Sequence, residues 1–111
     1  ILILLILLIM VSGCGDVKRE KEETLESVIA SGEFIVVDVR TEREYEDAHV
    51  VGALNIPYNQ IDEDIQLDKE MPILVYCMSG GRSKIAYDTV TNLGYTVYDL
   101  GAFSDVDLPK E

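Results

Sequence analysis

The stretch Tyr76-Cys77-Met78-Ser79-Gly80-Gly81-Arg82-Ser83 places a cysteine at the junction between a strand and a helix. The apolar run before it, residues 73–76, is typical of a buried parallel strand. After it, Ala86, Val90 and Leu93 fall on one face of a predicted helix. We therefore interpret the rest of the chain from this junction outward.

The loop after the cysteine is suited to binding an anion. Gly80 and Gly81 can adopt positive φ, which lets successive backbone N–H groups point into one small bowl in front of the helix dipole. Because a thiolate at Cys77 is itself an anion, the bowl and the charge of Arg82 favour a lowered pKa for the thiol. The sequence thus predicts a nucleophile in an anion cradle. The alternative is a small buried cysteine followed by an ordinary glycine turn.

The chain begins with an aliphatic run, residues 1–10, followed by Val11-Ser12-Gly13-Cys14. The run is too short to span a bilayer and is typical of the apolar part of a secretory signal. Its ending resembles a bacterial lipobox, whose cysteine is lipidated and becomes N-terminal after cleavage. We expect an N-terminally truncated lipoprotein signal over residues 1–13 and a lipid on Cys14. The protein would then be exported and anchored to a bacterial membrane; the alternative is an uncleaved N-terminal anchor.

The chain has two cysteines, and we expect one to be lipidated and the other to be a free thiol. With Cys14 lipidated, Cys77 has no partner for an intrachain disulfide, and a lone cysteine in an exported protein indicates a free reactive thiol. Residues 14–23 carry the lipidated cysteine and a polar tether of mixed charge. Residues 24–111 are enough for one domain with a modest core.

Strand and helix patterns alternate along this domain. We predict helices over 24–32, 42–46, 59–67 and 83–94, and strands over 34–37, 53–56, 73–76 and 95–100. This alternation predicts an α/β fold with a mostly parallel open sheet and helices on both faces. In such a sheet the ligand site lies at the carboxyl ends of the strands, where Cys77 and Asp38 both fall.

Two stretches resemble the rhodanese family of sulfurtransferases. They are DVRTEREYEDAHVVGALNIP, residues 38–57, and CMSGGRS, residues 77–83. With the flanking strands the resemblance covers residues 24–103. It implies a rhodanese-like fold and an enzyme without cofactor, in which Cys77 takes a sulfane sulfur from thiosulfate or another small donor. The resulting persulfide passes its sulfur to cyanide or a thiol.

The resemblance also implies which residues bind the substrate. They are the loop residues Met78, Ser79, Gly80, Gly81, Arg82 and Ser83, whose backbone donors would hold the donor or the persulfide. Two roles fit Arg82, which either holds the anion or braces the loop. We expect Ser83 to cap the following helix, with a role at the persulfide as the alternative. Several thiosulfate-using members have a basic residue where this chain has Met78, which favours a persulfide or polysulfide donor here.

The first of the two stretches is expected to be structural. Asp38, Arg40 and Glu44 should form ion pairs or caps at the sheet edge. His49 is the only histidine, so we predict no histidine-based metal site and expect this side chain to hold the turn before Gly52.

Loop length and charge separate the remaining functions. Phosphatases of the same architecture use a longer loop, whereas only four residues separate Cys77 from Arg82, which favours sulfur over phosphate as the bound group.

The net charge of −12 repels nucleic acid and anionic lipid head groups, so lipid must hold the protein to its membrane. A thiol-redox protein would need a resolving cysteine. The main alternative to an enzyme is a non-catalytic rhodanese-fold docking or sensing module. The sequence does not identify a protein partner, although its negative charge would favour a cationic or neutral one.

Overall fold

The computed structural model describes residues 23–111. The predicted signal over residues 1–13, the predicted lipidation at Cys14 and nearly all of the tether lie outside the described residues. Within residues 23–111, every helix is too short or too polar to cross a membrane.

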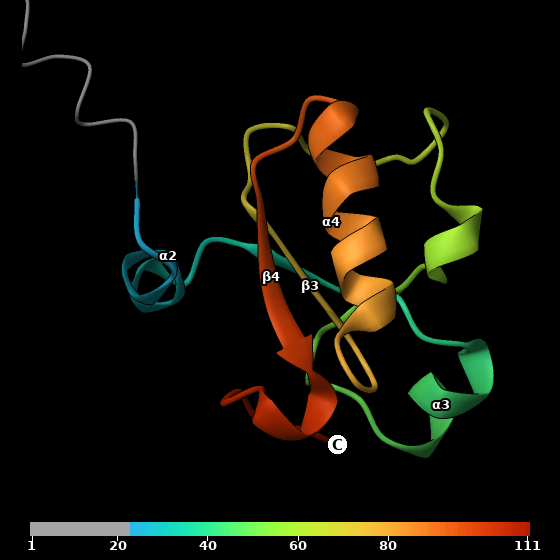
Figure 1. Cartoon of the computed structure of the whole chain (residues 1–111). Coiled ribbons are helices and arrows are strands. Elements are labelled where there is room, and N and C mark those ends of the chain that lie inside the picture. Colours follow the sequence, from blue (N-terminus) through green and yellow to red (C-terminus); the bar gives the residue numbers. More distant parts are fainter. Residues whose placement is uncertain (1–22) are drawn as a thin grey trace, which may run out of the picture.

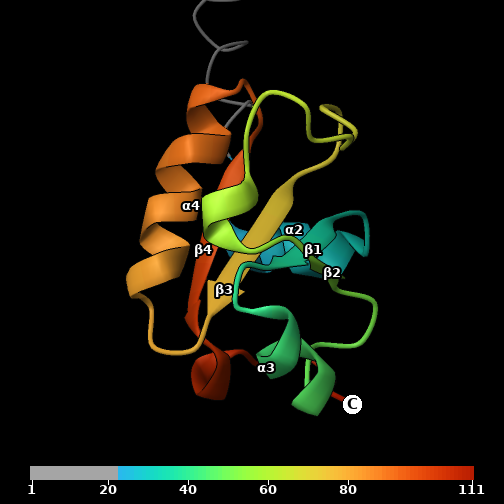
Figure 2. The same cartoon turned by 90° about the vertical axis from the view of Figure 1, so that its right-hand side faces the viewer.

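Four parallel strands form one open sheet (Figure 1 and Figure 2). They are β1 (Ile35–Asp38), β2 (Leu54–Asn55), β3 (Ile73–Cys77) and β4 (Val97–Ala102). Their order across the sheet is β2-β1-β3-β4, and each neighbouring pair is parallel. The structure confirms the predicted α/β class and the parallel open sheet.

Helices cover both faces of this sheet, as predicted. The α-helices are α2 (Leu25–Ser31), α3 (Glu42–Asp47) and α4 (Gly81–Asn92), and the 3-10 helices are η2 (Tyr58–Gln60) and η3 (Phe103–Asp105). Helix α4 and η2 lie on one face, and α2 lies on the other (Figure 2). Helix α3 and η3 lie near the end of the sheet where β3 turns into α4 (Figure 1).

Strand β3 divides the core into two hydrophobic clusters. Its residues are fully buried and alternate between them: Ile73, Val75 and Cys77 belong to the cluster under α4, and Leu74 and Tyr76 belong to the cluster under α2. Burial on both faces explains why this strand reads as an unbroken apolar run. Strand β3 thus contributes to the core on both faces of the sheet.

The capping signals of α2 are confirmed, but one predicted helix is wrong. Thr24 accepts a hydrogen bond from the Ser27 N–H, and Gly32 ends α2. The helix predicted over 59–67 is only the 3-10 turn η2 followed by turns. Asp62 accepts a hydrogen bond from the backbone N–H two residues further on, and this local bonding competes with a helix.

Candidate active site at the end of β3

Cys77 is the last residue of β3, and a short loop joins it to α4 at the carboxyl end of the sheet (Figure 1). The cysteine is fully buried, and it is a free thiol. The backbone N–H of Gly80 donates a hydrogen bond to its Sγ atom over 3.0 Å. The structure therefore places the predicted nucleophile where the loop folds back over it.

Gly80 shapes this loop. Its φ of 105° lies in the left-handed region that L side chains rarely adopt, and it occupies the N-cap position of α4. Gly81 has no positive φ and is the first residue of α4, so the expectation that both glycines would use this freedom is wrong for Gly81.

The N-cap prediction for Ser83 is also wrong. Because the helix already begins at Gly81, Ser83 is its third residue, and its hydroxyl donates to the Gly80 carbonyl over 3.1 Å. The side chain of Ser83 is buried beside the thiol instead of capping the helix. A hydroxyl rotates freely about its C–O bond, so the same proton can turn to Sγ when the cysteine is ionised.

Hydrogen bonds to sulfur outweigh the burial of Cys77. Burial alone raises the pKa of the thiol, because it disfavours the charged thiolate. The Ser83 hydroxyl and the backbone N–H groups of Ser83, Gly80 and Ser79 lower it, and the net pKa of Cys77 is below its ordinary value. The shift has the direction expected for an anion cradle.

Arg82 forms an ion pair with Glu44. Its Nη1 and Nη2 atoms donate to the two carboxylate oxygens of Glu44 over 2.9 and 3.1 Å. Glu44 lies on α3, where it also forms a capping box with Thr41. The hydrogen bond from Arg82 lowers the pKa of Glu44 to about 2. Of the two roles expected for Arg82, the geometry supports bracing, since the pair fastens α4 to α3.

A buried network lies at the neighbouring end of β1. The Asp38 carboxylate accepts hydrogen bonds from the Arg40 side chain over 2.6 to 3.0 Å and from the Tyr76 hydroxyl over 2.8 Å. The Tyr76 oxygen in turn accepts from the Val50 N–H over 3.0 Å, and the Arg40 guanidinium lies 4.4 Å from the Phe103 ring centroid. The ion pair predicted for Asp38 and Arg40 is confirmed.

His49 has structural contacts. Its ring stacks on Tyr45 with 3.9 Å between the ring centroids, and its Nδ1 atom lies 2.7 Å from the Tyr45 carbonyl oxygen. Nε2 lies 3.3 Å from the Glu111 carboxylate. Within residues 23–111, no group of three or more His, Cys, Asp or Glu side chains could hold a metal ion. These contacts are structural, as predicted for His49, but they join its side chain to α3 and to Glu111 and not to the turn before Gly52.

Two contributors were not predicted from the sequence. One is the Tyr76 hydroxyl, although a tyrosine at the end of an aliphatic strand is itself a signal, because a buried hydroxyl needs a partner. The other is the pairing of Glu44 with Arg82, which are 38 residues apart. No local pattern could have joined these two.

The fold and the site together define an α/β domain with a single activated cysteine at the end of a parallel strand. The rhodanese-like domain family matches residues 21–105, and the chain belongs to this family.

Its relatives include named sulfurtransferases. The chain is 37% identical over 78 residues to the thiosulfate sulfurtransferase PspE of Escherichia coli K12, a match covering 67% of this chain and 75% of that one. It is 31% identical over 75 residues to the thiosulfate sulfurtransferase GlpE of Coxiella burnetii, covering 66% and 70% of the two chains. A solved E. coli structure, described as a rhodanese with anions, is similar with a TM-score of 0.64 and 32% identity over 69% of this chain and 95% of that chain.

Proposed function

We propose that the protein is a sulfurtransferase that forms a persulfide on Cys77 and passes its outer sulfur to a thiophilic acceptor. The observation that carries this proposal is the convergence of N–H donors on a buried thiol whose pKa they lower. A thiolate is the nucleophilic form of cysteine, and fixed donors stabilise the anion that forms. The thiosulfate sulfurtransferase relatives support the same chemistry.

The reaction has two balanced steps. The Cys77 thiolate attacks the sulfane sulfur of the donor, a new S–S bond forms, and the donor's own S–S bond breaks. The electron pair of that bond leaves on sulfite when the donor is thiosulfate, on a thiolate when the donor is a persulfide, or on a shorter polysulfide when the donor is a polysulfide. Cyanide or an acceptor thiolate then attacks the outer sulfur, and the Cys77 thiolate is the leaving group.

The loop supplies the binding groups for this chemistry. The N–H groups of Met78, Ser79, Gly80, Gly81, Arg82 and Ser83 are proposed to hold the anionic persulfide or the donor's charged end. The Ser83 hydroxyl adds one mobile donor next to Sγ. Glu44 matches the charge of Arg82, and the half-exposed Met78 adds none. A persulfide, which carries one negative charge, is therefore favoured over the thiosulfate dianion.

Sulfur transfer to cyanide tests this proposal. The polypeptide 15–111 should produce thiocyanate from a low-molecular-weight persulfide and from thiosulfate, with the higher kcat/KM for the persulfide. Cys77→Ser should lose the activity while retaining the wild-type circular dichroism spectrum. If the folded wild-type protein transfers sulfur from neither donor, the domain is a docking or sensing module instead.

We further propose that the protein is exported and anchored to a bacterial membrane through lipid on Cys14, on the basis of the lipobox-like residues 11–14. The chain, expressed with a Met and basic residues added before Ile1, should incorporate an alkyne-labelled fatty acid in a bacterium. Cys14→Ser should abolish the label. Equal labelling of both proteins would contradict the anchor.

A further inference from the structure

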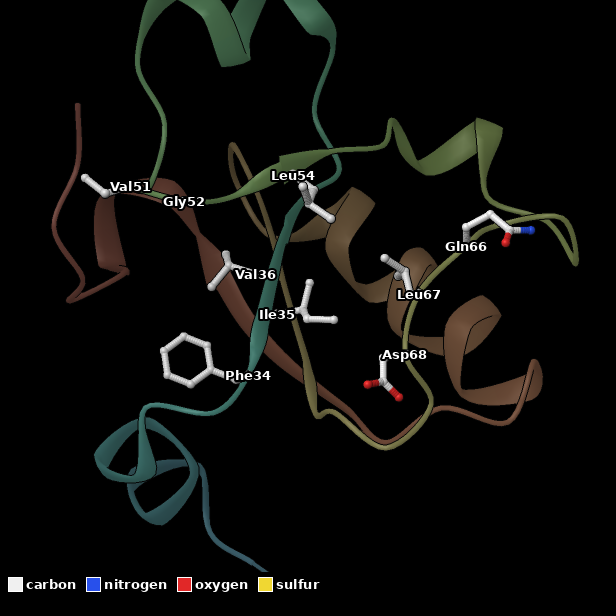
Figure 3. Close-up of a pocket in the computed structure, with 9 residues that line it drawn as sticks. All are labelled: Phe34, Ile35, Val36, Val51, Gly52, Leu54, Gln66, Leu67 and Asp68. Atoms are coloured by element: carbon white, nitrogen blue, oxygen red, sulfur yellow. The ribbon is translucent and has the colours of Figure 1, made fainter.

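A groove of about 450 Å³ lies along the outer edge of β1, away from Cys77 (Figure 3). Its lining residues are Phe34, Ile35, Val36, Val51, Gly52, Leu54, Gln66, Leu67 and Asp68. None of them belongs to the loop 77–83. The proposed sulfur transfer leaves this groove without a role.

The groove exists because β2 is too short to cover β1. Strand β2 has two residues, and they pair only with Val37 and Asp38. Successive residues of a strand direct their N–H groups alternately to the two sides. The Ile35 N–H donates to β3's side, at the Pro72 carbonyl, so the Val36 N–H faces the groove. The register with β2 begins only at Val37, and the loop, turn and cap hydrogen bonds found among the described residues do not involve the Val36 N–H.

Apolar side chains flank this free edge on both sides. Phe34 and Val36 lie on one side of β1, and Ile35 lies on the other (Figure 3). Val51 and Leu54 also line the groove and are 50% and 46% exposed. A backbone edge between two apolar walls has the shape that an added strand fills, with its alternate side chains packing on either wall.

The negative charge beside the groove favours a partner strand with basic side chains. Residues 66–68 line the groove, and the segment 62–70 to which they belong carries five carboxylates and one lysine. That lysine, Lys69, lies 5.4 Å from the Tyr95 ring centroid. Asp68 itself lines the groove. A partner strand with basic side chains would therefore be attracted, and an acidic one would be repelled.

We propose that the free edge of β1 binds an extended basic segment of another protein, which adds to the sheet as a strand. Its backbone pairs with the Val36 N–H, its apolar side chains pack on Val51 and Leu54, and a basic side chain approaches Asp68. Such a surface would bring a protein partner to the domain without occupying Cys77. The proposal does not depend on sulfur transfer.

Amide NMR on the polypeptide 15–111 tests it with defined probes. A hexapeptide of alternating lysine and valine should shift the Val36 amide resonance and slow its exchange with solvent, with further shifts over residues 51–54. The same peptide with glutamate in place of lysine should bind at least tenfold more weakly.

Matched variants distinguish binding in the groove from nonspecific binding of the peptide elsewhere on the surface. Leu54→Arg should weaken binding at least tenfold, whereas Ile85→Arg, which makes the same change at an equally exposed position on α4, should leave it unchanged. Asp68→Asn keeps an oxygen for the Glu70 N–H and should weaken binding about threefold by removing one charge.

Three outcomes would overturn the proposal. They are equal binding of the lysine and glutamate peptides, shifts that avoid Val36, and shifts of Val36 that grow with protein concentration alone. The last outcome would mean that a second copy of the chain occupies the edge.

Discussion

Two sites at the carboxyl ends of neighbouring strands, Cys77 on β3 and Asp38 on β1, are built in opposite ways. Both side chains are fully buried. The Asp38 carboxylate accepts hydrogen bonds from the Arg40 guanidinium and the Tyr76 hydroxyl. The charge of Arg40 neutralises that of Asp38, and both carboxylate oxygens have donors. At Cys77, several N–H donors converge on one sulfur, and this excess of donors favours a gain of negative charge.

This difference explains why two equally recognisable stretches have unequal chemical roles. A balanced buried ion pair has no capacity for another charged group, and removing either partner leaves the other unpaired. A cradle of backbone donors can hold a thiolate, a persulfide or the charged end of a donor with the same atoms. The end of β1 therefore supports the fold, and the end of β3 is suited to catalysis.

The largest effect is expected when the balanced site is broken. Asp38→Ala leaves the buried Arg40 without its carboxylate and should lower the free energy of unfolding by about 3–5 kcal/mol. Urea denaturation measures this change. The exposed Asp88→Ala should stay within about 0.5 kcal/mol of wild type. A loss below 1 kcal/mol in Asp38→Ala would mean that the network is not a structural support.

At Cys77, loss of a hydrogen-bond donor should change the reactivity of the thiol. Ser83→Ala removes one donor to the sulfur, and a hydrogen bond to a charged group contributes about 1.5–3 kcal/mol. Persulfide formation at pH 7 should therefore slow by about tenfold or more, and the midpoint of Cys77 alkylation against pH should move upward. An unchanged pH profile would show that the hydroxyl serves only the Gly80 carbonyl.

Adding charge to the loop should change the donor preference. Two unit charges about 4 Å apart in water interact by about 1 kcal/mol. Met78→Lys should raise kcat/KM for thiosulfate about fivefold and raise it less for a persulfide of lower charge. Met78→Gln serves as the uncharged control. Equal gains for both donors would contradict the assignment of Met78 as a determinant of donor charge.

The smallest effect concerns the brace between α3 and α4. Since the pKa of Glu44 is lowered to about 2, its pair with Arg82 stabilises the fold above the unfolded pKa of about 4.3, and this contribution is lost as the pH falls through 2. Glu44→Gln should thus lose less stability than wild type between pH 5 and 2. The difference should be about 1 kcal/mol or less, because both side chains are partly exposed.

Thermal unfolding across this pH range measures the brace. Glu46→Gln, an exposed change on the same helix, should follow the wild-type curve. If Glu44→Gln also follows that curve, the ion pair does not brace the loop in solution.

Much of this architecture could be predicted from hydrophobic patterns. The apolar run that ends in Cys77 and the caps of α2 are local signals, and the structure confirms them. The prediction of a helix over 59–67 was wrong because the apolar residues at helical spacing there pack singly against the core, while Asp62 closes a turn between them.

The details of the loop depended on geometry that the sequence does not encode locally. Serine is a better N-cap than glycine by preference, but the left-handed Gly80 begins α4 earlier and leaves Ser83 beside the sulfur. The ion pair between Arg82 and Glu44 could not be predicted from the sequence, because Glu44 comes close to Arg82 only when α3 and α4 meet at the end of the sheet.

The most direct test of the central claim is the intact mass of the polypeptide 15–111 after exposure to a polysulfide. The account predicts that one sulfur atom is added, that cyanide removes it, and that Cys77→Ser never acquires it. A folded wild-type protein that gains no sulfur, or a Cys77→Ser variant that gains as much, would contradict it.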